Sequence, residues 1–409
     1  MQALAYNPGD PELKVSPWTF YERIREEAPV LLSPAPVPGE DDFYVVSRYD
    51  DVAMVLRDKV RFSSHIADSV VSGEFLDPPA MINRDAPDHT RLRRVTNRSF
   101  GARALAPLTG KIQQVVSELV EELLSQPEVE FVEQFTTELP LRVIGGLMLG
   151  IPLERKAEIQ RWSEAVLETA GLIVGGDPDL VPGCVEDFLA LINFIDEQAT
   201  RRVGCPHRGD VLSELVDREA SGELSHDEVV GLGWSYIAAG QDTTMNLLAG
   251  GLQILLTDPL LAERLTAEPE RTEDFIEEYL RLYSPTQSVF RRLAEDVEMH
   301  GVVMPARSFV YVLVGSANRD PRVFPDPDVF DLDRPNSADH LAFGAGAHFC
   351  PGAVLGKMLG GLAFRALYPH LSRLSLDPER PPRMRTKPGA FGIEHMGILV
   401  SQDIPVLAD

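Results

Sequence analysis

The sequence predicts a mainly α-helical fold with a small β portion. Amphipathic windows with helical spacing fill most of residues 87–285, with clear examples at 111–125 and 185–202. Strand-like patterns are confined to the flanks, at 43–47, at 297–314 and in the tail. The chain has no repeat period, no low-complexity tract and no convincing internal boundary. We therefore expect one domain spanning 1–409.

Five parts are expected in order along this domain. A β-containing N-terminal part, about 1–60, opens with a helical pattern at 18–27. The helical body follows at about 87–285, and a β and irregular "meander" part at about 286–340. Prolines at 321, 325, 327 and 335 prevent a regular element from persisting there. A glycine-rich loop and a helix are expected at about 343–370, and short strands at about 371–409.

Charge and cysteine content exclude several classes of protein. The 409 residues hold 38 Lys plus Arg and 63 Asp plus Glu, a net charge of −25, which phosphate backbones repel. Three scattered cysteines are too few for a disulfide framework and indicate a reducing compartment. We find no signal pattern and no apolar stretch of the ~20 residues a membrane helix needs. The sequence predicts a cytoplasmic monomer that neither inserts into membranes nor binds nucleic acid.

The most informative stretch runs from Phe343 to Gly352 and reads Phe-Gly-Ala-Gly-Ala-His-Phe-Cys-Pro-Gly. Its glycines allow a tight turn or a close backbone approach to a flat ligand. Pro351 suits the first position of a helix, so Cys350 is expected where a helix begins. Backbone N–H groups and the helix dipole there favour a thiolate, which is a ligand for haem iron. The alternatives are a buried structural cysteine, or a zinc ligand paired with His348.

This stretch resembles the haem-binding loop of the cytochrome P450 superfamily, whose pattern is Phe-Gly-x-Gly-x-His-x-Cys-x-Gly. The resemblance implies the mainly α cytochrome P450 fold and a haem b, iron protoporphyrin IX, with Cys350 as the thiolate ligand of the iron. It also implies cofactor contacts by Phe343, Gly344, His348 and Gly352. The family often continues Leu-Ala-Arg after the cysteine, whereas this chain reads Leu355-Gly356-Lys357, so the packing of the next helix can differ.

A second stretch agrees with the resemblance. Ser225 and Glu228 have capping-box spacing and open a helix that is expected to reach about Asp258. Gly240 inside it costs about 1 kcal/mol relative to Ala, and the Thr243 hydroxyl can bond back to the Ala239 carbonyl. By resemblance, Ala239, Gly240 and Thr243 lie against the haem, and Asp242 with Thr243 forms the proton relay. The alternative is a helix with a solvated aspartate.

A third stretch is Glu278-x-x-Arg281, near the end of a helix that begins at Thr272 and is stopped by Ser284-Pro285. The two side chains are at i, i+3 and can pair on one face, although such pairs are usually solvated and weak. The motif precedes Cys350 by 350 − 278 = 72 residues, as in the family. The resemblance implies a buried pair, joined by Arg334, that supports the cysteine loop.

A fourth stretch places His89 and Arg93 at i, i+4 after Pro87, on one face of a helix. Two such donors suit an anionic ligand group. By resemblance they bind a haem propionate together with His348 and either Arg291 or Arg292. Without the resemblance these residues would be interpreted as surface charges.

The four stretches together predict a haem-thiolate monooxygenase, an oxidoreductase that activates dioxygen with two electrons from a redox partner. It would hydroxylate or epoxidise a hydrophobic small molecule such as a terpenoid, steroid, fatty acyl chain or polyketide-like compound. The alternatives are a peroxide-driven peroxygenase, which the Asp242–Thr243 pair disfavours, and a non-enzymatic haem sensor. By resemblance, the substrate pocket takes residues from four segments: Val70, Phe75, Ile237, Ala238, Val289, Phe290 and Phe391.

Basic residues are clustered although the chain as a whole is acidic. Between Asp88 and Glu118 there is no acidic residue, while several arginines occur there: Arg91, Arg94, Arg98 and Arg103. By resemblance this segment borders the cysteine side of the haem. We therefore expect a basic face that docks an acidic ferredoxin, which a reductase supplies with electrons, by electrostatic steering. The alternative is a solvated basic face.

Overall fold

Helices make up most of the computed structural model, which describes residues 4–35, 41–65, 80–172, 181–205, 208–386 and 390–402. The α-helices are α1 (Pro11–Val15), α2 (Trp18–Glu27), α3 (Tyr49–Arg57), α4 (Asp88–Phe100), α5 (Ala102–Leu105), α6 (Thr109–Leu124), α7 (Glu138–Pro140), α8 (Lys156–Leu172), α9 (Val181–Thr200), α10 (Val211–Ala220), α11 (His226–Thr257), α12 (Pro259–Ala267), α13 (Thr272–Tyr283), α14 (Val314–Ala317) and α15 (Ala353–Leu367). Two π-helical segments, Val132–Thr136 and Leu141–Met148, flank α7.

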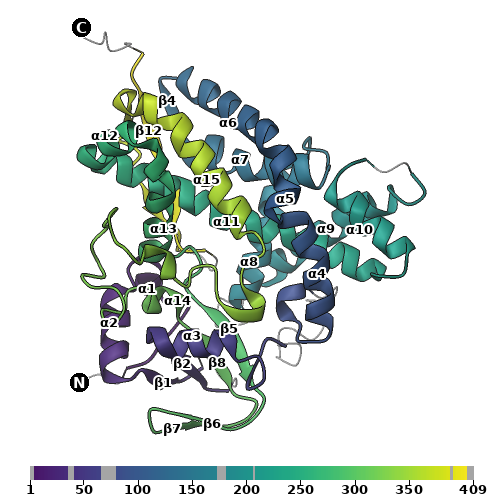
Figure 1. The fold of residues 1–409 in the computed structure, drawn as a ribbon, viewed down its shortest axis with the longest axis vertical. Helices are drawn as coiled ribbons and strands as arrows, with labels where there is room; N and C mark the ends of the chain where they lie inside the picture. Colours follow the sequence, from purple (N-terminus) through teal and green to yellow (C-terminus); the bar gives the residue numbers. More distant parts are fainter. Residues whose placement is uncertain are drawn as a thin grey trace.

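Within the described residues, the strands form one five-stranded sheet and three smaller ones. They are β1 (Val30–Ser33), β2 (Phe43–Val46), β3 (Phe62–Ser63), β4 (Glu128–Glu130), β5 (Val289–Leu293), β6 (Val297–Met299), β7 (Val302–Met304), β8 (Phe309–Val312), β9 (Leu374–Leu376), β10 (Arg383–Met384), β11 (Ile393–His395) and β12 (Gly397–Val400). The large sheet has the order β1-β2-β8-β5-β3 and lies at one end of the molecule, next to α2 and α3 (Figure 1).

This sheet joins the N-terminal part of the chain to the segment after α13. Strand β2 pairs in parallel with β8, with Tyr44 opposite Val310, and β5 pairs antiparallel with β8, with Val289 opposite Val312. The four residues of β2 are all buried, which accounts for their unbroken apolar and aromatic run. The sheet thereby holds β5, which carries Arg291, beside the helical body.

Helix α11 is the centre of the helical body. Ser225 and Glu228 form the capping box at its start, and the helix runs for 32 residues with most of its side chains buried. A helix that is apolar on nearly all sides must be covered by others, and α11 packs against α8, α9, α13 and α15. Figure 1 shows α15 passing beside it. These contacts bring the helix after Cys350 against the helix that contains Asp242 and Thr243.

The mainly α fold with small sheets is confirmed, and two local predictions are wrong. Val314 begins α14 and does not extend the strand region, because β8 ends at Val312 and the chain turns at Leu313. Helix α15 begins at Ala353 with Gly352 as its N-cap, so Cys350 lies in a turn before the helix. The division of 1–409 into one domain with five parts stays a prediction.

Among the described residues, no single helix is both long and apolar enough to cross a membrane. Helices α11 and α12 meet the length and composition criteria only as a pair, which is bent by 108° at the break between them. The apolar length of α11 is explained by its burial among other helices.

Candidate active site

The loop that carries Cys350 is held in a tight conformation by its glycines. Gly344 and Gly346 have φ values of 70° and 69°, a region that side chains disfavour. A Cβ on Gly346 would lie 2.8 Å from the Leu56 carbonyl oxygen at the end of α3. The Cys350 N–H donates to the Phe343 carbonyl over 2.8 Å, which closes the loop. The two glycines predicted for a tight turn therefore both occupy positions that require glycine.

Cys350 is half-buried, and its surroundings shift the pKa of its thiol in two directions. Burial raises the pKa, whereas the N–H groups of Gly352 and Ala353 and the charge of Arg93 lower it, with a net increase. The sequence predicted stabilisation of the thiolate by a helix start, and the two N–H groups that act on the sulfur belong to the N-cap and the first residue of α15. A metal ion bound to this sulfur would remove the remaining cost, because a coordinating thiol is deprotonated outright.

Four donor side chains that the sequence assigned to an anionic ligand come together near this loop. The rings of His89 and His348 lie 4.0 Å apart between centroids. Arg93 donates to the Phe349 carbonyl, which ties α4 to the cysteine loop. Burial lowers the pKa of Arg291 to about 10 and that of His348 to about 3, and His89 and Arg291 add to the effect on His348.

This cluster carries more positive charge and more donors than its protein partners satisfy. The Nε2 atom of His89 is buried with no hydrogen-bond partner among the described residues. Arg291 is 6% exposed and donates to the carbonyl of Phe290 over 2.6 Å. Arg292 donates to the Arg307 carbonyl, so Arg291 is the member of this pair that lies in the cluster. A buried ring nitrogen without a partner, next to the guanidinium groups of Arg93 and Arg291, fits the carboxylates of haem propionates.

One face of α11 is open although its neighbours are buried. Ser235, Ala239 and Thr243, at i, i+4 and i+8, are partly or fully exposed in the middle of this core helix, and so is Gly240. The Thr243 hydroxyl donates to the Ala239 carbonyl over 2.9 Å, as the sequence suggested. A Cβ on Gly240 would lie 2.3 Å from Ile144 Cδ1, so the end of that side chain would have to move.

Asp242 lies in different surroundings from Thr243. It is 3% exposed, and its Oδ2 accepts from Arg385 Nη1 over 2.5 Å. Burial raises the pKa of Asp242, and Arg385 opposes the shift. The alternative of a solvated aspartate is therefore wrong. Sequence analysis missed Arg385, which lies in an irregular proline-rich tail where no periodic pattern marks a buried position.

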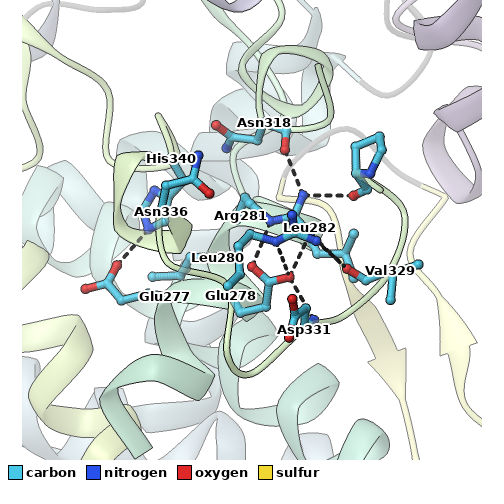
Figure 2. Close-up of polar contacts among 12 residues, drawn as sticks. Glu277, Glu278, Leu280, Arg281, Leu282, Asn318, Val329, Asp331, Asn336 and His340 are labelled. Carbon is cyan, nitrogen blue, oxygen red and sulfur yellow. Dashed lines mark hydrogen bonds and ion pairs between the residues drawn. The ribbon is translucent and has the colours of Figure 1, made fainter. Parts of the chain in front are cut away.

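Glu278 forms the centre of a fully buried ionic network (Figure 2). It accepts from Arg281 through both carboxylate oxygens, each over 2.8 Å, and from Arg334 Nε over 3.0 Å. The Asp331 N–H donates to it over 2.9 Å. The predicted three-residue contact is thus present in the structure.

The two arginines extend this network to the meander. Arg281 donates to the carbonyls of Asn318, Pro327 and Val329. Arg334 donates to those of Pro325, Asp326 and Val329. Residues 318–335 contain almost no regular structure, so these side-chain bonds replace the backbone pairing that proline prevents.

Glu277, next to Glu278, links the same helix to the segments on either side of the cysteine loop. Its carboxylate accepts from Lys357 Nζ over 2.7 Å and pairs with His340 Nε2 at 2.9 Å, as Figure 2 shows for the histidine. These partners lower the pKa of Glu277 to about 2 against the effect of burial. Lys357 stands where the family often has arginine, and Glu277 gives its charge a partner.

The residues predicted for a substrate pocket are spread over different surroundings. Val289 and Phe290 are half-buried in β5, and the Phe391 ring packs edge-on against Trp18 at 5.2 Å. Ile237 and Ala238 are each 2% exposed within the main core, beside the open face of α11. Val70 and Phe75 lie outside the described residues. Ser235, which sequence analysis missed, is on the open face and one turn before Ala239.

The arginines of the expected docking face also differ from one another. Arg91 pairs with both carboxylate oxygens of Glu228, so its charge is already compensated. Arg94, Arg98 and Arg103 are exposed, and within the part of the chain that the structure describes no carboxylate pairs with them.

Two apolar side chains close to Cys350 in the sequence are also exposed: Phe349 is 43% exposed and Val354 is 41% exposed.

Comparison with known proteins identifies the family. The family model for cytochrome P450 matches residues 183–398. The polyketide biosynthesis cytochrome P450 PksS of Bacillus subtilis is 31% identical over 98% of this chain and 100% of its own length. The 6-deoxyerythronolide B hydroxylase of Saccharopolyspora erythraea is 33% identical, covering 87% of this chain and 89% of its own. The epothilone D-bound structure of cytochrome P450epoK superposes with a TM-score of 0.87 at 28% identity, covering 98% and 100% of the two chains.

The family model, the relatives and the structural similarity agree with the geometry of the cysteine loop and its donor cluster. The protein is therefore an oxidoreductase with haem as its cofactor and a cysteine thiolate as the axial ligand of the iron. The chain belongs to the cytochrome P450 family and is a monooxygenase.

Proposed function

We propose that this monooxygenase hydroxylates or epoxidises a polyketide-like small molecule, with Cys350 as the thiolate ligand and an acidic ferredoxin as the electron donor. The observation that carries the proposal is the cluster of buried donors beside the tight loop that ends at Cys350, in which His89 Nε2 has no partner and Arg291 has no carboxylate partner among the described residues. A flat dianionic cofactor explains both features, and a structural cysteine or a zinc site explains neither.

Each residue of the site has a distinct task. When bound, haem would activate dioxygen, using two electrons that the redox partner delivers. His89, Arg93, Arg291 and His348 would neutralise and orient the two propionates. The N–H groups of Gly352 and Ala353 stabilise charge on the Cys350 sulfur. Phe343 and Gly344 would pack against the cofactor on the cysteine side, and Ala239 and Gly240 on the opposite side.

Thr243 is the residue best placed to handle protons at the reacting centre. Its hydroxyl lies on the open face of α11 and donates to the Ala239 carbonyl, so its oxygen lone pairs are oriented to accept a hydrogen bond from another donor. Asp242 is the buried acid next to it in sequence. We propose that these two residues relay protons. Arg385 holds the Asp242 carboxylate through its ion pair.

The substrate class is supported by the relatives. PksS is named for polyketide biosynthesis, the hydroxylase acts on 6-deoxyerythronolide B, and the solved structure holds epothilone D. In this chain the segments expected around the substrate contribute apolar side chains, including Val289, Phe290 and Phe391. An apolar pocket of this kind favours a large hydrophobic substrate.

The docking face for the ferredoxin would combine apolar and basic side chains. Arg94 and Arg98, at i, i+4 on the exposed side of α4, and Arg103 supply uncompensated positive charge. Phe349 and Val354 supply exposed apolar surface close to Cys350 in the sequence. Because Arg91 is paired with Glu228, we assign it a smaller part in steering than the other three.

The decisive experiment is reconstituted turnover. The purified holoenzyme is incubated with a ferredoxin, its reductase, NADPH and ¹⁸O₂ against a panel of macrolactones, with steroids, terpenoids and fatty acids as comparison substrates. We expect one ¹⁸O atom in a macrolactone product and little product with hydrogen peroxide alone. Product from peroxide alone, or from another class only, would contradict the proposal.

A further inference from the structure

A histidine at the start of α11 contacts two neighbouring helices at once. His226 is the first residue of α11, with its Nε2 atom 2.7 Å from Asp196 Oδ1 on α9 and its Nδ1 atom 3.0 Å from Glu219 Oε1 on α10. Figure 1 shows α9 and α10 together at one side of the molecule. The two carboxylates face opposite nitrogens of the ring, and no group of such residues in the described part of the chain converges on a metal position.

Both contacts of His226 can be hydrogen bonds only while the ring carries two protons. A neutral imidazole has one N–H and one lone pair, and a carboxylate oxygen can only accept. A neutral His226 would therefore turn a lone pair toward one of the carboxylates. His340 is arranged differently, because its Nδ1 accepts from the Ala342 N–H while its Nε2 faces the Glu277 carboxylate. A neutral ring satisfies both contacts of His340, whereas the geometry at His226 fits an imidazolium.

The two carboxylates differ in how much they depend on the histidine. The Glu219 side chain is 26% exposed, and its Oε2 atom is buried without a partner among the described residues. The Asp196 side chain is 51% exposed and also accepts from the Thr200 hydroxyl over 3.4 Å. Water and Thr200 can replace the ring N–H at Asp196, but Glu219 already has one oxygen unsatisfied. A neutral ring should therefore keep its single N–H at Nδ1, toward Glu219, and lose its hydrogen bond to α9.

The charged groups around His226 favour the protonated ring. The hydrogen bond to Asp196 raises the pKa of His226 most, and Glu219 raises it further, against the effect of burial. A raised pKa means that the two ion pairs are fully formed below about pH 6.5 and are lost as the pH rises through the pKa in the folded protein. The other charged side chains close by in sequence are exposed or have partners of their own: Asp227 is exposed, Glu197 pairs with Arg201, Arg218 with Glu223, and Glu228 with Arg91.

We propose that His226 is a pH-sensitive clamp between α9 and α11. As an imidazolium it holds the ends of α9 and α10 at the start of α11, and as a neutral ring it keeps Glu219 and releases α9. In this step the N–H bond at Nε2 breaks and its proton passes to water, which reaches the half-buried ring.

The clamp acts on the helices that cover the proposed active site. Helix α9 packs on α8, and both pack on α11, whose open face carries Thr243. Release of the end of α9 should loosen this cover and weaken the binding of a large substrate as the pH rises. This regulation rests on the proposed function, whereas the clamp itself can be detected without a substrate.

The protonation state is measured by nuclear magnetic resonance of the ¹⁵N-histidine-labelled holoenzyme, reduced and carbon monoxide-bound so that the iron is diamagnetic. The His226 signals are assigned by their absence in His226→Gln. We expect a midpoint above about pH 6.5 and a neutral form protonated at Nδ1, the tautomer that free histidine disfavours. A midpoint at or below that pH, or a neutral form protonated at Nε2, would overturn the proposal.

Release of α9 is measured by backbone hydrogen exchange, corrected for the intrinsic effect of pH on the exchange rate. Exchange in the last turns of α9 should become about two- to fivefold faster as His226 loses its proton, the range expected for one half-exposed ion pair. His226→Gln should abolish this pH dependence. His300→Gln is the matched control, because His300 is equally exposed but pairs with a single carboxylate, that of Asp51, and it should leave the pH dependence intact.

Two further variants test how the ring divides its contacts. In Glu219→Gln the amide N–H can donate to Nδ1, so neutral His226 keeps its N–H toward Asp196 and α9 should stay held at high pH. Asp196→Asn should lower the midpoint of His226 and abolish the pH dependence at α9. Release of α9 that persists in Glu219→Gln, or exchange in the wild type that does not follow the protonation of His226, would refute the clamp.

The consequence for the site is measured by the spin-state shift that a macrolactone induces. Its dissociation constant should rise up to about fivefold through the titration of His226 in the wild type and in His300→Gln, and stay constant in His226→Gln. An unchanged affinity despite faster exchange at α9 would refute the regulation of the site. Absence of a spin shift with every macrolactone at every pH would count against the proposed function, and the resonance and exchange measurements would still decide whether the clamp exists.

Discussion

Asp242 and Thr243 are adjacent in sequence, but the helix turns their side chains into surroundings with opposite physical demands. Thr243 lies on the open face of α11 with its hydroxyl directed by the Ala239 carbonyl. Asp242 is buried, which raises the pKa of its carboxyl, and its ion pair with Arg385 opposes that shift. A relay that uses both residues therefore also depends on Arg385, because this side chain is bound to the Asp242 carboxylate.

Replacement of Thr243 by alanine should uncouple the enzyme. Because the change removes only the hydroxyl, Thr243→Ala should bind haem and substrate like the wild type but divert most reducing equivalents to hydrogen peroxide. The measurement is peroxide formed per NADPH consumed. Thr257→Ala is the control, since Thr257 makes the same backbone contact, to Gln253, at the exposed end of α11. A fully coupled Thr243→Ala enzyme would exclude Thr243 from the relay.

Glu278→Gln should destabilise the protein severely. The change removes one buried negative charge and leaves two buried arginines without their carboxylate partner, and breaking such a pair costs about 3–5 kcal/mol. The free energy of unfolding in urea measures this, together with the fraction of haem retained. Glu273→Gln, on the same helix with an 80% exposed side chain, is the control and should cost little. Equal stability of the two variants would contradict a supporting role for Glu278.

At the scale of elements, the cysteine loop is shaped by its contact with α3 as well as by its own turns. Gly346 combines a positive φ with a backbone approach to Leu56 and Arg57 so close that no side chain fits. The loop therefore depends on the N-terminal part of the chain for its position. Flexible side chains could yield to an added methyl group, but the backbone of α3 cannot.

Gly346→Ala should therefore cost more than its backbone conformation alone explains. A residue with a side chain in the left-handed region costs about 1–2 kcal/mol, and overpacking adds about 1–3 kcal/mol. Gly301→Ala is the matched control, because Gly301 has a φ of 77° and nothing within 4 Å of an added Cβ. Urea unfolding of both variants separates the two contributions. Similar losses for both would mean that the contact with α3 is unimportant.

The elements predicted well from the sequence are those whose signals are local. The capping box at Ser225 placed the start of α11 correctly, and the apolar pattern with Ser284-Pro285 placed both ends of α13. The pairing of Glu278 with Arg334 was predicted only through the family resemblance, because 56 residues separate them. Arg385 was missed, since its partner lies 143 residues away and its own segment has no periodic pattern.

At the scale of the whole molecule, exposed positive charge is concentrated on one segment of an acidic chain. The chain has a net charge of −25, yet Arg94, Arg98 and Arg103 are exposed on a segment without acidic residues. Such an asymmetry steers an acidic partner to one face and repels it from the others. The partners of Arg91 and Lys357 show that a basic residue in this region does not always contribute free charge.

Reversing the charges of Arg94 and Arg98 should slow electron transfer from an acidic ferredoxin. Arg94→Glu/Arg98→Glu removes attraction that acts before contact, so the bimolecular rate should fall and lose most of its dependence on salt. Stopped-flow reduction of the haem at several ionic strengths measures both effects. Arg161→Glu/Arg201→Glu changes the net charge equally on α8 and just after α9 and should have a much smaller effect. Equal rates for the two double variants would rule out the docking face.

The central claim, that Cys350 is the thiolate ligand of a haem, is tested most directly by the carbon monoxide difference spectrum of the dithionite-reduced protein. We predict a strongly red-shifted Soret band for the wild type and for Cys184→Ser and Cys205→Ser, and loss of that band in Cys350→Ser. A wild-type haem band without the red shift, absence of haem, or an unchanged spectrum in Cys350→Ser would contradict the account.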